Sequence, residues 1–278
     1  MEPTTTQFQQ MCNSNKNGLR VGIINADDPS AEYFASDVAK PLTYGVEKGD
    51  LKAQKVKTTP SGSQYNVNYG GEELKIKTQL PGSFNVYNSL AVVGVGISLN
   101  LTPDQIQHGI ASLAGVAGRM TRIDEGQDFD VIVDYAHTPD SFEKLFKDLK
   151  PVIKGRLIVM FGSAGRRDEA KRAVQGELAG KYCDIVVLTE EDDRDIDGNQ
   201  ILEEIAAGVE KTGKVRNQNL FLVHDRTNAI EFALKSAKSG DTVLLLGKGH
   251  EKTIEREDRE DPWDEMGITR QLLTDLDK

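Results

Sequence analysis

The chain has 278 residues, of which 38% are apolar and 28% charged, and its formal net charge is −10. Its length predicts about two domains, and its acidity excludes a general nucleic-acid binder, because phosphate contacts need clustered Lys and Arg. Two cysteines, Cys12 and Cys183, are too few for a disulfide framework, and the longest apolar run, residues 90–99, has half of the roughly 20 residues of a membrane span. With a polar first 20 residues and no signal peptide, we expect a cytoplasmic protein without membrane insertion.

The first part of the chain mixes several kinds of element. Residues 1–18 are rich in Thr, Gln and Asn and predict a weakly ordered lead-in. Residues 19–25 form a short apolar run that predicts a buried strand, followed by a turn and a helix starting near Pro29. Residues 64–77 alternate in polarity across Gly70-Gly71, which indicates a hairpin.

Two helices are expected next. Residues 84–99 are apolar and predict a helix buried on several faces. Thr102 and Pro103 are favoured N-cap and first-turn residues, so a second helix is predicted to begin there. We expect a domain boundary near residues 115–118, which divides the chain into domains 1–116 and 117–278.

From residue 128 the pattern becomes regular. Apolar runs predict five strands, at residues 131–133, 157–161, 185–188, 220–223 and 243–246. Amphipathic stretches predict helices between them, at residues 141–149, 169–181, 200–211 and 227–237. This alternation predicts an α/β, Rossmann-like domain with a mostly parallel sheet and helices on both faces. Ligands of such sheets bind at the carboxyl ends of the strands.

Polar clusters follow four of these predicted strands. The first reads Asp134-Tyr-Ala-His-Thr-Pro-Asp140 and suits a nucleotide or its phosphates, although a helix cap with a surface His is as compatible. The second reads Phe161-Gly-Ser-Ala-Gly-Arg-Arg-Asp168. Its small residues let a ligand approach the backbone, and its arginines recognise carboxylate or phosphate. The alternative is a Gly-rich turn with solvated arginines.

The third cluster reads Thr189-Glu-Glu-Asp-Asp-Arg-Asp195. Its carboxylates could hold an ammonium group and Arg194 a carboxylate, a combination that suits an amino-acid ligand. The alternatives are a solvated acidic loop and a divalent metal site, although the spacing is not that of an EF-hand. The fourth cluster, Gly247-Lys-Gly-His-Glu251, favours function because packing alone does not explain it.

Other residues receive structural interpretations. His108 and His224 lack charged company in the sequence and are interpreted as structural or surface residues, and Trp263 as a packing anchor. No Gly-x-x-x-x-Gly-Lys-Ser/Thr phosphate loop occurs in the chain, and no Gly-x-Gly-x-x-Gly follows the first strand of the second domain, which disfavours a dehydrogenase. The clusters together predict a cleft for an anionic nucleotide and a zwitterion.

Six motifs carry a family resemblance: Pro81-Gly-Ser-Phe-Asn-Val-Tyr-Asn88, Gly118-Arg-Met120, Asp134 to Asp140, Arg167-Asp168, Thr189 to Arg194 and Gly247 to Glu251. In this order and at about this spacing they resemble the Mur ligases, above all the MurE branch of UDP-N-acetylmuramoyl-tripeptide synthetases. The resemblance implies a UDP-sugar domain, a central ATPase domain and a C-terminal Rossmann-like domain that presents an amino acid. Such enzymes use ATP and Mg²⁺ to join an amino acid to the carboxylate end of UDP-MurNAc-L-Ala-D-Glu through an acyl phosphate.

Site residues carried over from the resemblance fall into two sets. The ATP site is expected to comprise Asn85 and Asn88 by the adenine, with Arg119, Asp134, His137 and Lys248. The amino-acid site is expected to comprise Arg167, Glu191, Asp192, Asp193, Arg194, Gly247 and Glu251. No residue is assigned to a metal, and the catalytic residues are unknown. In family members that use meso-diaminopimelate, this segment commonly reads Asp-Asn-Pro-Arg. The presence of Arg194 therefore favours diaminopimelate over L-lysine as the substrate. The three residues before it, Glu191-Asp192-Asp193, depart from the family pattern.

The resemblance starts near Gly22 and leaves several family parts without a counterpart. These are the UDP-sugar domain, the phosphate loop, and the carbamylated lysine with its metal ligands, where Thr4 to Thr6 stand instead. The first domain is therefore expected to be the second half of the ATPase domain, with an open strand edge, and the isolated chain is expected not to hydrolyse ATP. The missing portion could be a separate chain. The alternative is a non-catalytic or split fragment that binds amino acid, nucleotide or a partner without turnover.

Overall fold

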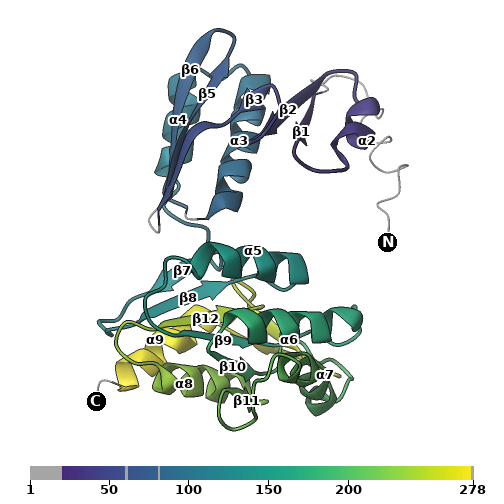
Figure 1. Cartoon of the computed structure of the whole chain (residues 1–278), viewed down its shortest axis with the longest axis vertical. Helices are drawn as coiled ribbons and strands as arrows, with labels where there is room; N and C mark the ends of the chain where they lie inside the picture. The colour runs from purple at the N-terminus through teal and green to yellow at the C-terminus, as the bar shows by residue number, and fades with distance from the viewer. Residues whose placement is uncertain (1–20, 60–61, 81, 277–278) are drawn as a thin grey trace. The chain divides into compact units, whose positions relative to one another are not determined.

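The computed structural model describes residues 21–59, 62–80 and 82–276. These form two compact units, one ending at Ala114 and the other beginning at Gly115 (Figure 1). The predicted lead-in at residues 1–18 lies outside the described residues. None of the described helices combines the length and apolarity needed to cross a membrane.

The first unit contains one parallel and one antiparallel sheet. The parallel sheet is β1 (Gly22–Asn25), β2 (Pro41–Gly45) and β3 (Leu51–Lys52), with the short helix α2 (Ala31–Ser36) between β1 and β2. The antiparallel sheet is β4 (Gln54–Thr59), β5 (Gly62–Tyr69) and β6 (Glu72–Thr78), followed by α3 (Ser83–Ser98) and α4 (Pro103–Ser112). Buried side chains of β3, β5, β6, α3 and α4 share one core.

The predicted hairpin and helix starts of this unit can be compared directly with the structure. The predicted hairpin is confirmed: Tyr69 pairs with Glu72, and Gly70 and Gly71 both have positive φ, as a two-residue hairpin turn requires. The predicted start of α4 is also confirmed, since Thr102 accepts a hydrogen bond from the amide of Gln105 in a capping box. The helix expected near Pro29 begins at Ala31.

The prediction that α3 is buried on several faces is wrong for one face. Leu90 and Val93 are buried, but Val92, Val95 and Leu99 are about half exposed. Val92 and Val95 lie three positions apart in α3 and Leu99 directly follows its last residue, so the three form one exposed apolar stripe. The amino-acid composition of residues 84–99 did not indicate this exposed stripe, because apolar residues occur on all sides of the predicted helix.

The second unit is a six-stranded sheet covered by helices on both faces. Its strands are β7 (Thr121–Ile123), β8 (Asp130–Asp134), β9 (Leu157–Phe161), β10 (Ile185–Leu188), β11 (Leu220–Leu222) and β12 (Thr242–Leu246). Their order is β11-β10-β9-β12-β8-β7, and only β7 runs antiparallel to its neighbour. The α/β fold with a mostly parallel sheet is thereby confirmed.

The helices of this unit divide between the two faces (Figure 1). On one face α5 (Pro139–Leu149), α6 (Ala170–Tyr182) and α7 (Gly198–Glu210) bury Phe142, Ala179 and Ile205 against the sheet. On the other, α8 (Arg226–Ser236) and α9 (Glu265–Leu276) bury Ile230 and Leu273. A hairpin of β13 (Thr253–Glu255) and β14 (Glu260–Pro262) precedes α9. The predicted strands and helices of this part are confirmed within two residues at their ends, whereas β7, β13, β14 and α9 were not predicted.

Candidate functional site

The four clusters meet around one pocket at the carboxyl ends of β8, β9 and β10 and beside the turn that follows β12. The pocket has a volume of about 830 Å³, which is within the range of small-molecule sites. Residues that line it are Tyr135, His137, Thr138, Pro139, Ala164, Arg167, Asp168, Ala170, Lys171, Val174, Glu191, Asp192, Arg194, Glu251 and Glu255. The expectation that polar side chains at these strand ends converge is therefore met within the second unit.

The loop after β8 is held in shape by Asp134. Its buried carboxylate accepts hydrogen bonds from the amides of Met120, at 2.7 Å, and Ala136, at 2.8 Å. Burial raises the pKa of Asp134, although these amides oppose the rise. Asp134 is not among the lining residues of the pocket, and its carboxylate joins the loop after β8 to Met120, the residue before β7.

The following residues of this loop form a small aromatic group. The Tyr135 ring lies 4.7 Å from the His137 ring and 5.2 Å from the His250 ring, centroid to centroid. The Arg119 guanidinium lies over the Tyr135 ring at 4.8 Å, a cation–π distance. Arg119 and His137, both expected at the nucleotide, are thus brought together by Tyr135, which sequence reasoning had not selected.

Lys248 is the centre of the loop after β12. Its side chain is 1% exposed, and its Nζ contacts Asp192 Oδ1 at 2.9 Å and Glu251 Oε2 at 2.6 Å. Glu251 also accepts a hydrogen bond from Tyr135 Oη at 2.9 Å. The buried ammonium group thus joins the loops after β10 and β12, and the Tyr135–Glu251 hydrogen bond adds the loop after β8. The observed contacts of Lys248 are inside the protein.

Gly247 is where this loop comes closest to the acidic segment. Its φ is +104°, and a Cβ at this position would lie 2.7 Å from Glu191 Oε2. A side chain would therefore displace the Glu191 carboxylate as well as strain the backbone. Burial raises the pKa of Glu191, with Lys171 as the main opposing charge.

The acidic segment after β10 is not a solvated loop, and that alternative is wrong. Glu190, Glu191, Asp192 and Asp193 are between 3% and 7% exposed. Buried carboxylates need partners, and those of three of the four come from distant parts of the chain: Arg256 for Glu190, Lys248 for Asp192 and His224 for Asp193. The segment is an organised part of the pocket wall.

Arg194 and Glu255 form an ion pair at the pocket wall. The Arg194 Nε donates to Glu255 Oε2 at 2.7 Å, and its Nη1 donates to the Gly165 carbonyl at 2.6 Å. Glu255 was not selected from the sequence. The available signal was its position in the charge-rich run at residues 255–261, four residues after Glu251.

Arg167 differs from Arg194 in having no ion pair with any described residue. It is exposed, it lines the pocket, and it lies in the loop after β9. Its neighbour Arg166 instead pairs with Asp195 at 2.5 Å. The Arg167 guanidinium is thus available to an anionic group in the pocket.

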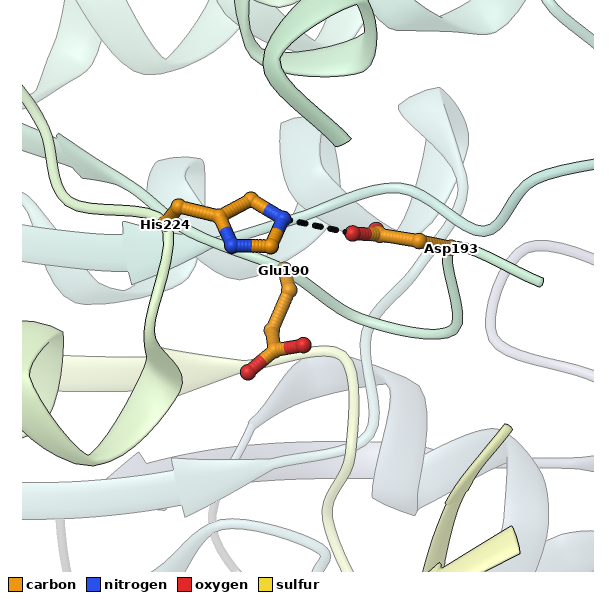
Figure 2. A group of neighbouring side chains, drawn as sticks. All are labelled: Glu190, Asp193 and His224. Carbon is orange, nitrogen blue, oxygen red and sulfur yellow. Dashed lines mark hydrogen bonds and ion pairs between the residues drawn. The ribbon is translucent and has the colours of Figure 1, made fainter. Parts of the chain in front are cut away.

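A second group of ionisable side chains lies outside the pocket lining. Ligand atoms of Glu190, Asp193 and His224 lie within 4.8 Å of one another, and Figure 2 shows the Asp193 carboxylate pointing at the His224 ring while the Glu190 side chain extends away from the pair. The distance from His224 Nε2 to Asp193 Oδ2 is 2.6 Å. His224 therefore has a charged partner that its neighbours in the sequence did not indicate, and this contact agrees with its interpretation as a structural or surface residue.

This group does not fit a metal site well. Glu190 Oε2 is 2.5 Å from Arg256 Nη1, and Glu190 Oε1 accepts from the Arg226 amide at 3.3 Å. The Arg226 guanidinium, itself fully buried, is bound to Glu265. A cation would have to compete with an arginine for Glu190, and we propose no metal there.

The adenine-side residues lie in the first unit, in the first turns of α3. Asn88 Nδ2 donates to Asn85 Oδ1 at 3.0 Å, and Asn85 is 8% exposed. Their role at a nucleotide stays a prediction. Trp263 packs against the core under α8 and α9, and its Nε1 donates to Glu265 Oε2 at 2.7 Å, as expected of an anchor.

Comparisons with known proteins agree with this architecture. Residues 118–249 match the Mur ligase, glutamate ligase domain, and residues 5–96 match the Mur ligase middle domain. The chain is 42% identical over 261 residues to a UDP-N-acetylmuramyl-tripeptide synthetase of Roseiflexus sp. (strain RS-1), covering 92% of this chain and 51% of that protein. It is 38% identical over 269 residues to a UDP-N-acetylmuramoyl-L-alanyl-D-glutamate–2,6-diaminopimelate ligase of Syntrophomonas wolfei, covering 96% of this chain and 54% of that protein.

A solved structure shows the same relationship. A UDP-N-acetylmuramoyl-L-alanyl-D-glutamate–2,6-diaminopimelate ligase superposes with a TM-score of 0.59 at 28% identity, covering 93% of this chain and 54% of that one. The chain thus spans about half the length of the curated relatives it matches. With both domain matches, the sequence identities and the shared fold in agreement, the chain belongs to the Mur ligase family and carries sequence of its middle and C-terminal domains.

Proposed function

We propose that this chain is the later part of a MurE-type ligase of peptidoglycan precursor synthesis. The first unit would be the second half of the ATPase domain, and the second unit the domain that presents an amino acid. The complete protein would join a diamino acid, meso-diaminopimelate or L-lysine, to UDP-MurNAc-L-Ala-D-Glu. ATP would phosphorylate the carboxylate, the amine would displace phosphate from the acyl phosphate, and ADP and phosphate would leave.

The observation that carries this proposal is the pocket itself. It combines one unpaired guanidinium, Arg167, with carboxylates of Glu191, Asp192 and Glu251 at the carboxyl ends of parallel strands, of which the last two each contact Lys248 through one oxygen. An amino acid presents a carboxylate and an ammonium group, and these two kinds of side chain recognise them by charge-assisted hydrogen bonds. The names of the similar proteins support the same class of ligand.

ATP and Mg²⁺ are proposed for the complete protein. ATP would supply the activated phosphoryl group, and Arg119 and His137 would face it from the second unit. Two acidic side chains of the described pocket, Asp192 and Glu251, do not fit a magnesium ion, because both are bound to Lys248. The 278 residues contain no Gly-Lys-Ser/Thr loop, so the chain by itself is proposed to bind without turnover.

Calorimetric titration of the pure chain with meso-diaminopimelate and with L-lysine tests the amino-acid site. We expect one of the two to bind, and Arg167→Ala to weaken that binding at least about tenfold, which corresponds to about 1.4 kcal/mol for a lost charge-assisted contact. Arg122→Ala is the matched control, since Arg122 is an exposed arginine of β7 outside this pocket. Binding of neither amino acid, or equal weakening by both substitutions, would contradict the proposed site.

A further inference from the structure

Resting on the proposed function, we propose that Glu255 determines which diamino acid the pocket accepts. By pairing with Arg194 it neutralises the guanidinium that a second carboxylate would need. The pocket then selects a diamino acid whose side chain ends in an ammonium group alone, as in L-lysine, over one that carries a second carboxylate beside it, as in diaminopimelate.

The position of Glu255 is built by three contacts with the loop after β10. Its amide donates to Asp192 Oδ1 at 2.8 Å, its carbonyl accepts from the Arg194 amide at 3.2 Å, and its carboxylate accepts from Arg194 Nε at 2.7 Å. Arg194 has a φ of +56°, in the left-handed region that a residue with a side chain adopts at a cost. The strand β13 is thus tied to this loop by backbone as well as side-chain bonds, and the pair is a fixed feature of the pocket.

Two of the remaining cations of the pocket already contact acceptor groups of the protein. Lys248 is buried between two carboxylates, and Lys171 Nζ donates to the His137 carbonyl at 3.1 Å. Arg167 is the one lining arginine of the described pocket without an ion pair, and a single guanidinium serves one α-carboxylate. A second carboxylate bound at Arg194 would lie close to the Glu255 carboxylate, and two like charges at this distance repel each other.

For a distal ammonium group of the ligand, Glu255 is instead a hydrogen-bond acceptor. Glu255 uses Oε2 for Arg194, and among the described residues Oε1 has no hydrogen-bond donor. Its side chain is 42% exposed and lines the pocket. A distal ammonium group can therefore bind Oε1 without breaking the ion pair. The same carboxylate that blocks a second carboxylate provides an acceptor for the amine.

L-lysine and meso-diaminopimelate are matched probes, because they differ by one carboxyl group on the distal carbon. Titrated into the wild-type chain, L-lysine should bind at least tenfold more tightly than diaminopimelate. Glu255→Gln should reduce this ratio at least tenfold, by weakening L-lysine and by releasing Arg194 to diaminopimelate. Glu260→Gln is the control, since Glu260 is an exposed glutamate paired in register with Glu255 across the same hairpin. In the double variant with Arg194→Ala the gain for diaminopimelate should disappear.

Each outcome has one meaning. The fraction of folded protein affects the apparent dissociation constants of both probes equally. The ratio of the two constants measured on one preparation can therefore be interpreted even for a partly unfolded variant. Tighter binding of diaminopimelate by the wild type, or an unchanged ratio in Glu255→Gln, would overturn the role of Glu255 and leave the amino-acid site intact. Binding of neither probe would overturn the amino-acid site, and the role of Glu255 with it.

Discussion

Asp193 shows how much the chemistry of one residue depends on a distant partner. It is 7% exposed, its Oδ2 is bound by His224, and its buried Oδ1 has no hydrogen-bond partner among the described residues. Burial raises the pKa of Asp193, and the hydrogen bond from His224 opposes the rise. Of the two carboxylate oxygens of Asp193, only Oδ2 has a hydrogen-bond partner among the described residues, and that partner is His224.

Removal of His224 should destabilise the second unit. In His224→Ala the Asp193 carboxylate keeps its burial and loses its partner, which we expect to lower the free energy of unfolding by about 1–3 kcal/mol. Urea unfolding followed by the fluorescence of Trp263 measures this, because Trp263 is the one tryptophan of the chain and packs in this unit.

His108→Ala is the control for this substitution, since His108 is exposed and its ring contacts a backbone carbonyl of its own helix. The double variant His224→Ala, Asp193→Asn should lose less than the sum of the two single changes, because removal of both partners leaves no unpaired buried charge. Unchanged stability of His224→Ala would show that this contact contributes nothing.

Between elements, Asp241 joins the start of β12 to the residue before β9. Its carboxylate accepts from the Arg156 amide at 2.8 Å, from Arg156 Nη2 at 2.6 Å and from the Lys238 amide at 2.8 Å. Burial by itself raises the pKa of Asp241, but these hydrogen bonds outweigh it, and the pKa in the folded protein is lowered. The pairing of two central strands is thus secured at their amino ends by one ionised carboxylate.

A lowered carboxyl pKa makes this contribution dependent on pH. The stabilisation is fully present above the unfolded pKa, near 3.8, and is lost as the pH falls through the lower folded pKa. At pH 7 Asp241→Asn should lower the free energy of unfolding by about 1.5–3 kcal/mol, the range for hydrogen bonds to charged groups. The difference from the wild type should shrink as the pH falls below about 4.

Urea unfolding between pH 7 and pH 3, again followed by Trp263, gives this comparison. Asp258→Asn serves as the control, because the Asp258 side chain is 79% exposed and its nearest ion-pair atom is 4.0 Å away. A deficit of Asp241→Asn that stays constant down to pH 3 would contradict the ionic origin of the contact.

At the level of the whole molecule, each unit has its own hydrophobic core. The second unit has a core on each face of its sheet, built by α5 to α7 on one side and by α8 and α9 on the other. The core of the first unit is built from β3, β5, β6, α3 and α4. A unit with a complete core can fold alone.

Residues 115–278 should therefore fold without the first unit. Expressed alone, this segment should show the same Trp263-detected urea midpoint as the full chain, because the apolar contacts of its core are internal to it. A midpoint lowered by the equivalent of more than about 1 kcal/mol would contradict independent folding, and equal midpoints would make the segment a simpler protein for the binding experiments.

The regular elements of the second unit were predictable because their causes are local. Five apolar runs of three to five residues became β8 to β12, and the caps and glycines that start or turn an element act within a few positions of it. The hairpin at Gly70-Gly71 and the start of α4 at Thr102 have the same origin. The short strands β13 and β14 were not predicted, because they are recognised by their pairing with each other and not by an apolar run in the sequence.

The amino-acid sequence by itself determined the α/β fold, the family and the loops that surround the pocket, because periodicity and motif order are carried by neighbouring residues. Only the tertiary structure decided which charges meet. Lys248 reaches Asp192 across 56 positions, Arg194 reaches Glu255 across 61, and His224 reaches Asp193 across 31. Whether an acidic run is solvated or buried, and whether an arginine is available to a ligand, depends on partners that only the packed sheet brings within 3 Å.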